Sequence, residues 1–231
     1  MINPKALRKQ FYLDSLYHFN KFCLGYKDMV VHVHGPICQA LQAPTTRKLI
    51  CVPRGTFKST NSTIGFPIWL LEHNPNLRIL IDSEIFSNST NFLREIKGHY
   101  EHNEDFRSVF GDRVGELWNS EEIVIKTRTI HKKEPSIVCS GIGAGKTSQH
   151  YDVIIADDLS SYKNITSKDL AQKTIDHFKL YTSLLEPTGT LVVIGTRYSE
   201  LDIIGFVVEN ELGVKGGDVE KLRKLYCGQV R

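Results

Sequence analysis

The chain contains five short apolar runs of the kind that form buried β-strands. They are rich in valine, isoleucine and leucine, and they occupy residues 48–52, 77–82, 136–140, 152–157 and 190–196. Continuous apolar runs of this length are typical of strands that are buried on both faces. Segments with helical periodicity separate most of these runs. The pattern therefore predicts an α/β fold with a mainly parallel central sheet flanked by helices.

The predicted helices have apolar residues spaced three and four positions apart. They span residues 7–24, 36–43, 58–72, 87–102, 167–185 and 199–212. Gly65 and Pro67 fall in the middle of the third segment, where both residue types disfavour a regular helix. A further run at 121–130 alternates polar and apolar residues, which predicts a half-exposed strand.

The order of these elements divides the chain into three parts. Residues 1–46 are predicted to form an N-terminal helical segment, and residues 47–212 the α/β core. Residues 213–231 are rich in glycine and lysine and are predicted to form a tail or linker. A length of 231 residues suits one large domain, or a domain with such a tail.

Composition favours a soluble, intracellular protein. Hydrophobic residues make up 41% of the chain, which is enough for a sizeable core, and the five cysteines form no CxxC pair. An odd number of scattered cysteines favours reduced thiols over a disulfide framework. No apolar run approaches the roughly 18 residues of a membrane span, so no membrane partner is expected. The net charge of +3 permits a polyanionic partner without requiring one.

Two stretches are candidates for a phosphate-binding loop, which needs a strand before it and a helix after it. The first, "SGIGAGKT" at residues 140–147, has the lysine and hydroxyl of such a loop. Only "SQHY" separates it from the next strand, which leaves no room for a helix. The second, "LICVPRGTFKST" at residues 49–60, follows a predicted strand and precedes a predicted helix. It departs from GxxxxGK[ST], because Val52 and Phe57 stand where glycines are usual.

The second stretch passes the test of context, and its side chains suit phosphate. Lys58 would neutralise the β- and γ-phosphates of a nucleotide, and the Ser59 hydroxyl would reach Mg²⁺. Taken alone, the same letters also fit an ordinary basic and hydroxyl-rich loop. The rest of the site therefore has to decide between the two interpretations.

Polar groups follow two of the predicted buried strands. Asp157 and Asp158 come at the carboxyl end of one strand, where ligands bind in open α/β sheets. Asp157 would hold Mg²⁺ through water, and Asp158 would orient or deprotonate an attacking water. A turn or helix cap after a core strand is the alternative. Gly195, Thr196 and Arg197 end the next strand, where they would sense the γ-phosphate or couple it to movement.

In this order the segments resemble the ATPase domain of the large terminase subunit, the DNA-packaging motor of tailed bacteriophages. "PRGTFKST" looks like a deviant Walker A motif of that family, and "GIGAGKTSQHYDVIIADDL" like its glycine-rich loop running into Walker B. "PNLRILIDSEIFSNSTNFLREIKGHYEHNEDFRSVFG" is similar to the family's stretch after the first helix, and "VVIGTRYSELDIIG" resembles its coupling motif. The resemblance covers about residues 28–205 and implies a P-loop NTPase fold of the ASCE type.

The resemblance also implies ATP and Mg²⁺ as cofactors and gives roles to individual residues. Asp158 would be the catalytic carboxylate, although it is shorter than the glutamate that many terminases have at this position. Asp157 would be the Walker B metal carboxylate, with Ser59 as a second Mg²⁺ contact. Gly195, Thr196 and Arg197 would form the coupling motif, with Thr196 beside the nucleotide. The nucleotide-binding loop would consist of Pro53, Arg54, Gly55, Thr56, Phe57, Lys58, Ser59 and Thr60, of which Arg54 and Lys58 would also be catalytic.

Three further assignments follow from the family. Gln39, in "HVHGPICQAL", is the candidate for adenine recognition, which would make residues 1–46 the adenine side of the site. The family hydrolyses ATP as a ring in which a basic residue completes the neighbouring site. Lys146 is the candidate for that trans-acting residue, with Arg128 as the second choice.

The implied function is ATP hydrolysis that drives double-stranded viral DNA into a procapsid. The expected partners are the DNA, the portal or procapsid, the small terminase subunit and further copies of the chain, in the host cytoplasm. Full-length large terminases also carry a nuclease domain after the ATPase. This chain stops shortly after the coupling motif, so no nuclease activity is expected from it.

Two other functions remain open from the sequence. One is a helicase-like DNA-remodelling ATPase of related strand order, which would need a second ATPase lobe. The other is a degenerate, non-catalytic P-loop module for assembly, suggested by the missing glycines and by Asp158 in place of glutamate.

Two polar clusters outside these motifs have simpler interpretations. His32 and His34, near Cys38, lack a second set of ligands at metal-site spacing, so they are interpreted as satisfied or solvated histidines. Lys132 and Lys133 are interpreted first as an exposed turn and only second as a DNA contact.

Overall fold

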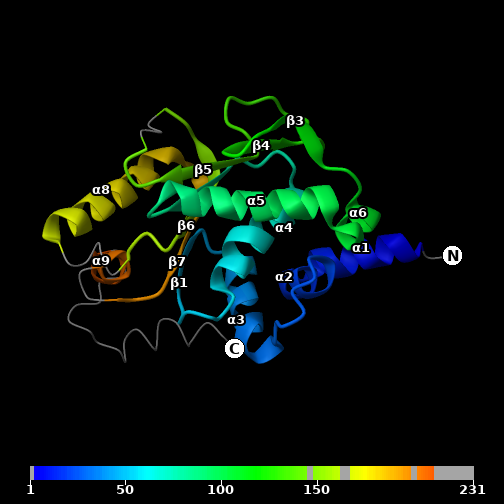
Figure 1. Cartoon of the computed structure of the whole chain (residues 1–231), viewed down its shortest axis with the longest axis horizontal. Helices are drawn as coiled ribbons and strands as arrows, with labels where there is room; N and C mark the ends of the chain where they lie inside the picture. The colour runs from blue at the N-terminus through cyan, green and yellow to red at the C-terminus, as the bar shows by residue number, and fades with distance from the viewer. Residues whose placement is uncertain (1–2, 145–147, 162–166, 199–201, 211–231) are drawn as a thin grey trace.

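A computed structural model describes residues 3–144, 148–161, 167–198 and 202–210 of the chain (Figure 1). Within these residues the chain forms a seven-stranded sheet with the strand order β1-β7-β6-β2-β5-β4-β3. The first five strands of this order run parallel to one another, while β4 pairs antiparallel with both of its neighbours, β5 and β3. The protein is therefore a mixed α/β protein with a mostly parallel sheet, as the apolar pattern predicts.

The five predicted buried runs all form the parallel part of the sheet. The strands are β1 (Arg47–Cys51), β2 (Ile79–Ser83), β5 (Ile137–Gly141), β6 (Tyr151–Asp157) and β7 (Leu185–Gly195). Every residue of β2 and β5 is buried, as expected for strands covered on both faces. β7 lies between β1 and β6 and pairs with both of them.

The antiparallel edge differs from the prediction. The strand expected at 121–130 is shorter and ends as β4 (Glu122–Ile125), because the following residues leave the sheet as a loop. The edge strand β3 (Val114–Trp118) and the helix α6 (Glu104–Phe110) were not predicted. The start of α6 has a clear local cause, since the Asn103 side chain accepts a hydrogen bond of 2.9 Å from the Phe106 N–H.

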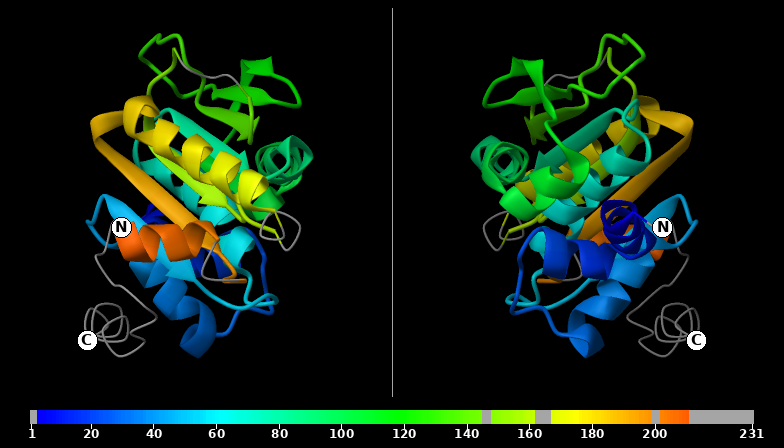
Figure 2. Two further views of the ribbon diagram at one scale, coloured as in Figure 1. Left: turned by 90° about the vertical axis from the view of Figure 1, so that its left-hand side faces the viewer. Right: turned by 90° about the vertical axis from the view of Figure 1, so that its right-hand side faces the viewer.

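Helices cover both faces of the sheet, and each face has its own apolar cluster (Figure 2). One face packs against the N-terminal helices together with α4 (Phe66–His73), α5 (Phe86–His102) and α6. The other face packs against α8 (Lys168–Leu184) and α9 (Ile203–Asn210). Alternation along β2 shows the division, because Ile79 and Ile81 belong to the first cluster and Leu80 to the second.

The N-terminal helices correct two predicted boundaries. The single helix expected at 7–24 is wrong, because Ser15 is extended (φ −144°) and accepts a hydrogen bond from the His18 N–H. The chain instead forms α1 (Pro4–Asp14), α2 (Leu16–His18) and a π-helical turn η1 (Phe19–Cys23). The helix expected from residue 36 begins earlier, as α3 (Val31–Gln42), where Nδ1 of His34 lies 2.8 Å from the Val30 nitrogen.

Two predictions near the end of the chain can be followed only in part. The helix expected at 199–212 is described as α9 from Ile203 to Asn210. Residues 199–201 and the predicted tail at 213–231 lie outside the described residues.

The helix predicted at 58–72 is confirmed, but its first turns are widened. It is helical from Lys58 to His73, and its stretch η2 (Thr60–Gly65) is π-helical before α4 begins at Phe66. π-helical turns of this kind often occur at functional sites. Gly65 ends the π-helical stretch against the buried side chain of Asn20, which donates a hydrogen bond of 2.9 Å to Asn61.

The Gly65→Ala variant is expected to be destabilised by about 2–3 kcal/mol, because overpacked cores lose about this much. A Cβ atom at residue 65 would lie 2.1 Å from Oδ1 of the buried Asn20. Gly98→Ala is the matched control, since a Cβ atom at this position in α5 meets nothing within 4 Å. The control should gain about 0.5–1 kcal/mol from its higher helix propensity. Urea denaturation of both variants gives the measurement, and shifts of the same sign and size would contradict the packing argument.

Candidate functional site

The carboxyl ends of three neighbouring strands bring the predicted site residues together. β1 and β6 both pair with β7, and the registers align Cys51 with Gly195 and Asp157 with Ile194. The segments that leave these ends are the loop at 52–57, the two aspartates after β6, and Thr196 with its neighbours. The carboxyl ends of the strands are where ligands bind in open α/β sheets.

The loop after β1, the predicted phosphate-binding loop, contains two residues with left-handed backbone. Gly55 and Phe57 both adopt the left-handed conformation, with φ of 80° and 50°, and the helix begins at Lys58. Phe57 stands at the position where the motif has its second glycine, so a bulky residue here takes a conformation that favours glycine. Its ring packs edge-on against His34 of α3, with the ring centroids 5.2 Å apart. This tertiary contact offsets the strain of the left-handed backbone.

Lys58 is the central side chain of the site. It is 7% exposed, and its Nζ lies 2.7 Å from Oδ2 and 3.0 Å from Oδ1 of Asp158. The same ammonium donates a hydrogen bond of 3.0 Å to Oγ1 of Thr196. One buried cation thus joins the loop after β1 to the segments that follow β6 and β7.

Asp158 is held in place from two directions. Its backbone is left-handed (φ 47°), and Oδ1 accepts a 3.2 Å hydrogen bond from the Thr196 N–H as well as the bond from Lys58. Its side chain is 37% exposed, so the carboxylate faces solvent on its remaining side. Gly195 leaves room for it, because a Cβ atom there would lie 3.1 Å from Oδ1 of Asp158. A carboxylate that is fixed yet accessible suits proton transfer with a bound water.

Asp157 is the buried carboxylate of the site, at 1% exposure. Thr63 in the π-helical stretch donates a 2.6 Å hydrogen bond to its Oδ2. Oδ1 is buried, and within the described residues it accepts no hydrogen bond of ordinary geometry, although the Ser59 hydroxyl approaches the carboxylate. The sequence motifs pointed to Ser59 and Thr60, and they missed Thr63.

Burial raises the pKa of Asp157 from 3.8 to about 6, while hydrogen bonding to Thr63 and Ser59 and the charge of Lys58 act in the opposite direction. Oδ1 of Asp157 and the nearby hydroxyl of Ser59 are two hard oxygen ligands of the kind that Mg²⁺ prefers. The residues present therefore fit a divalent cation. Such a cation would favour the charged form of Asp157.

Arg54 contacts a residue that the sequence motifs did not single out. Its Nη2 and Nε lie 2.5 and 3.1 Å from the hydroxyl oxygen of Tyr198, and the guanidinium carbon lies 5.5 Å from the ring centroid. The Tyr198 N–H donates a 2.7 Å hydrogen bond to Asp202, which precedes α9. The loop after β1 is thereby linked to the segment after β7, beside the exposed Arg197.

The remaining predicted residues are more dispersed. Pro53 and Thr56 lie in the turn after β1, where the Thr56 hydroxyl donates a 2.7 Å hydrogen bond to the Pro53 carbonyl. Gln39 is exposed on α3, and Thr60 begins the π-helical stretch. Arg128 lies at the opposite edge of the sheet, before β5, and Lys146 lies outside the described residues.

The stretch "SGIGAGKT", of which the structure describes residues 140–144, leaves the sheet at the end of β5. β5 is separated from β1 by β7, β6 and β2, and from β6 by β2 alone. At about 4.8 Å per strand spacing, these separations are about 19 Å and about 10 Å. Residues 148–150 then lead into β6 without a helix. Within the described residues, a helix thus follows "PRGTFKST" directly, and none lies between "SGIGAGKT" and β6.

The described part of the chain lacks two further features. No group of three or more histidine, cysteine, aspartate or glutamate side chains is arranged to hold a metal ion there. Across the same residues, no helix combines the length and apolar character that crossing a membrane requires.

Comparison with known proteins shows the fold alone. No family model matches the chain, and no curated protein matches it in sequence. Among solved structures it is similar to Saccharomyces cerevisiae Dbp5 bound to Nup159, Gle1, IP6 and ADP, with a TM-score of 0.50 and 11% sequence identity. The match covers 84% of this chain and 48% of that chain, so this chain spans about half the length of its structural neighbour. The likeness is consistent with a P-loop, RecA-like α/β fold.

Proposed function

We propose that the chain is an ATPase of the ASCE type, in which an additional strand separates the P-loop strand from the Walker B strand. The observation that carries the proposal is the position of Lys58, whose Nζ lies within 3.0 Å of both Asp158 and Thr196. β7 is the additional strand, between β1 and β6. Three segments distant in sequence thus supply a cation, a carboxylate and a hydroxyl at the carboxyl ends of the parallel strands.

In the proposed reaction, the phosphates of ATP lie over the loop at 53–57 and the first turn of the following helix. Lys58 and Arg54 stabilise the negative charge of the phosphates, and backbone N–H groups of the helix start contribute in the same way. Asp157 and Ser59 would hold Mg²⁺, which supplies further stabilisation of phosphate charge.

Asp158 orients a water and accepts its proton as the water oxygen attacks the γ-phosphorus. The bond from that phosphorus to the bridging oxygen breaks, which releases ADP and phosphate. Asp158 is paired with Lys58 in the structure, so the phosphates of a bound ATP would compete with Asp158 for Lys58. Thr196, which touches both side chains, is the natural sensor of this exchange.

We further propose that hydrolysis drives translocation along double-stranded DNA, as in the large terminase subunit of tailed bacteriophages. The ordered set of motifs supports this finer assignment, because each segment reaches the same edge of the sheet in the order in which the family has it. In that case the active form is a ring of identical chains, with Lys146 reaching the neighbouring site, and portal and small terminase proteins as partners. A helicase-like ATPase would use the same Lys58–Asp158 geometry, so the DNA assay has to separate the two.

ATP turnover of the purified chain tests the proposal, with Lys58→Ala as the inactive reference. We expect wild-type turnover to rise with protein concentration and with added duplex DNA, and Lys58→Ala to lose about a hundredfold or more. Displacement of a bound obstacle from duplex DNA without strand separation supports a translocase, whereas strand separation supports the helicase-like alternative. Equal rates in wild type and Lys58→Ala would exclude the ATPase.

A further inference from the structure

The loop between β4 and β5 is the most cationic short segment among the described residues that lie away from the candidate ATP site. Residues 126–133 read "KTRTIHKK", with four lysines or arginines, one histidine and no acidic residue. The whole chain has 29 lysines and arginines against 26 acidic residues, an excess of only three. This one loop therefore concentrates more positive charge than the net charge of the entire chain.

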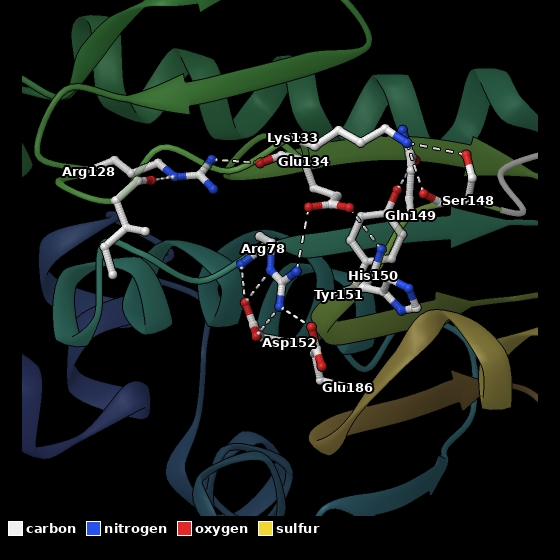
Figure 3. Close-up of polar contacts among 11 residues, drawn as sticks. Arg78, Arg128, Lys133, Glu134, Ser148, Gln149, His150, Tyr151, Asp152 and Glu186 are labelled. Carbon is white, nitrogen blue, oxygen red and sulfur yellow. Dashed lines mark hydrogen bonds and ion pairs between the residues drawn. The ribbon is translucent and has the colours of Figure 1, made fainter.

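Three acidic groups near this loop bind Arg78 (Figure 3). Arg78 is 5% exposed and binds three carboxylates, with its nitrogens 2.8 Å from Asp152, 2.6 Å from Glu186 and 3.5 Å from Glu134. Glu134 is itself buried and accepts a second hydrogen bond from the His150 N–H. The carboxylates are thus engaged internally, and the lysines of the loop lie on the outside.

The loop is held in one conformation by several hydrogen bonds. Oδ1 of Asn76 accepts bonds of 3.0 and 2.9 Å from the N–H groups of Thr129 and Ile130. Arg128 donates a 2.9 Å bond to the Ile130 carbonyl and a 2.8 Å bond to the Glu134 carbonyl. Arg128 therefore stabilises the conformation of the loop, and its guanidinium is not directed at an external partner. A loop that is held in one conformation binds a partner with little loss of conformational entropy.

The outward part of the loop is the basic tip, which we define as residues 130–133. Ile130 is 49% exposed, and His131, Lys132 and Lys133 are exposed as well. Within the described residues, Lys133 bonds to neutral acceptors alone, the carbonyl and hydroxyl of Ser148 at 3.0 and 3.3 Å (Figure 3). Lys126, by contrast, already has an anionic partner, since its Nζ lies 2.9 Å from Asp112. Among the described residues neither Lys132 nor Lys133 forms an ion pair, although the charge of Lys132 also acts on Asp152, so both ammonium groups can contact an external anion.

We propose that the basic tip binds the phosphate backbone of double-stranded DNA, with Lys132 and Lys133 on the phosphates and Ile130 against the sugar edge. The choice of DNA as the polyanion rests on the proposed function. Within the tip, Ile130 is the single large apolar side chain, which is too little apolar surface for the core of a protein interface. Residues 126–133 contain no phenylalanine, tyrosine or tryptophan on which unpaired bases would stack, which favours a duplex over a single strand.

The basic tip and the candidate ATP site lie at opposite ends of the same strands. Arg78 directly precedes β2, and Asp152 lies near the start of β6, whereas Asp157 ends that strand. Five residues of β-strand separate the two aspartates by about 17 Å. Binding at the tip therefore leaves the phosphate loop unobstructed.

Fluorescence anisotropy of a labelled random-sequence duplex, measured without nucleotide over a range of salt concentrations, tests the proposal. The double variant Lys132→Ala/Lys133→Ala should bind on the order of tenfold more weakly at 50 mM salt. Its plot of log affinity against log salt should lose about two units of slope, one for each phosphate contact. The matched control Lys168→Ala/Lys173→Ala removes the same charge from exposed positions on α8 and should bind like wild type.

Two further measurements keep the outcome clear. Lys132→Arg/Lys133→Arg, which retains the charge, should keep wild-type affinity, and equal unfolding midpoints exclude misfolding as the cause of any loss. Equal weakening in the tip and control variants would overturn the proposal, as would unchanged binding in the tip variant. Tighter binding of a labelled acidic polypeptide than of the labelled duplex, lost in the tip variant, would also overturn it, in favour of a protein partner. The assay contains no ATP, so DNA binding is measured independently of hydrolysis. If the tip binds DNA but the protein hydrolyses no ATP, the proposed ATPase function is wrong and the proposed DNA contact stands.

Discussion

Replacing Asp158 by asparagine is expected to abolish ATP hydrolysis while tightening nucleotide binding. The amide cannot accept the proton of the attacking water, and loss of a general base costs about 10²–10⁴ in rate. The amide also carries no charge, so it releases Lys58 from an ion pair of 2.7 Å that the phosphates must otherwise break. Because the Asp158 side chain is 37% exposed, solvent screens this pair, and the gain in affinity should be only severalfold.

The two effects are measured separately. Titration with a fluorescent ATP analogue gives the affinity, and single-turnover hydrolysis gives the chemical rate. Asp158→Glu is the informative control, because it restores a carboxylate with a longer reach at the position where many terminases have glutamate. Parallel losses of affinity and rate in Asp158→Asn would show that the carboxylate is structural, and would contradict the exchange of partners at Lys58.

Replacing Asp157 by asparagine is expected to stabilise the metal-free protein while weakening its Mg²⁺ binding. The pKa of Asp157 is raised from 3.8 to about 6 by burial, so at neutral pH the folded protein carries a desolvated charge. A shift of this size corresponds to about 3 kcal/mol of lost stability, which the uncharged amide does not suffer. Mg²⁺ affinity should fall strongly, because the amide loses the charge that attracts the cation.

The pH dependence gives this prediction its sign. Above about pH 6 Asp157 is ionised in both states, so the full cost is present and Asp157→Asn has its largest advantage. Between about pH 6 and pH 4 the folded state holds a proton that the unfolded state lacks, and the advantage shrinks as the pH falls. Below about pH 4 the carboxyl is protonated in both states and the difference vanishes. Denaturant unfolding of both proteins at pH 4, 5 and 7.5 without metal measures this, and a difference independent of pH would contradict it.

Much of the fold follows from local sequence, and the location of the site follows from context. The apolar runs predict the five parallel strands because buried strands need no alternation, and the helix after Lys58 is the feature on which the predicted phosphate loop depends. A match to the GxxxxGK[ST] motif alone favours "GAGKT" as the phosphate-binding loop, because the motif does not include the helix start that presents N–H groups to the phosphates. Phe57 shows why the letters mislead: packing against His34 holds a left-handed backbone that elsewhere would require glycine.

The features that sequence reasoning missed depend on tertiary contacts. Thr63 is 94 residues from Asp157, and it faces the carboxylate from a π-helical stretch that helical periodicity does not anticipate. Tyr198 is 144 residues from Arg54. Helix α6 has a local sequence signal, an asparagine cap followed by two acidic residues, but at seven residues it is too short for a clear apolar periodicity. The break at Ser15 likewise comes from one capping hydroxyl inside an otherwise helical pattern.

Strand β6 has a mechanical consequence for a motor of the proposed kind. It is hydrogen-bonded on both sides, to β2 and β7, and it connects the carboxylate that anchors Arg78 to the carboxylates beside Lys58. A strand with hydrogen-bonded neighbours on both sides is rigid. Force generated at the phosphates would therefore be transmitted through the sheet to the basic tip, but the tip would not move relative to the sheet. Displacement of DNA would have to arise from rotation of the entire subunit against its neighbours. The length of each step would then depend on the rotation angle and on the distance of the basic tip from the rotation axis.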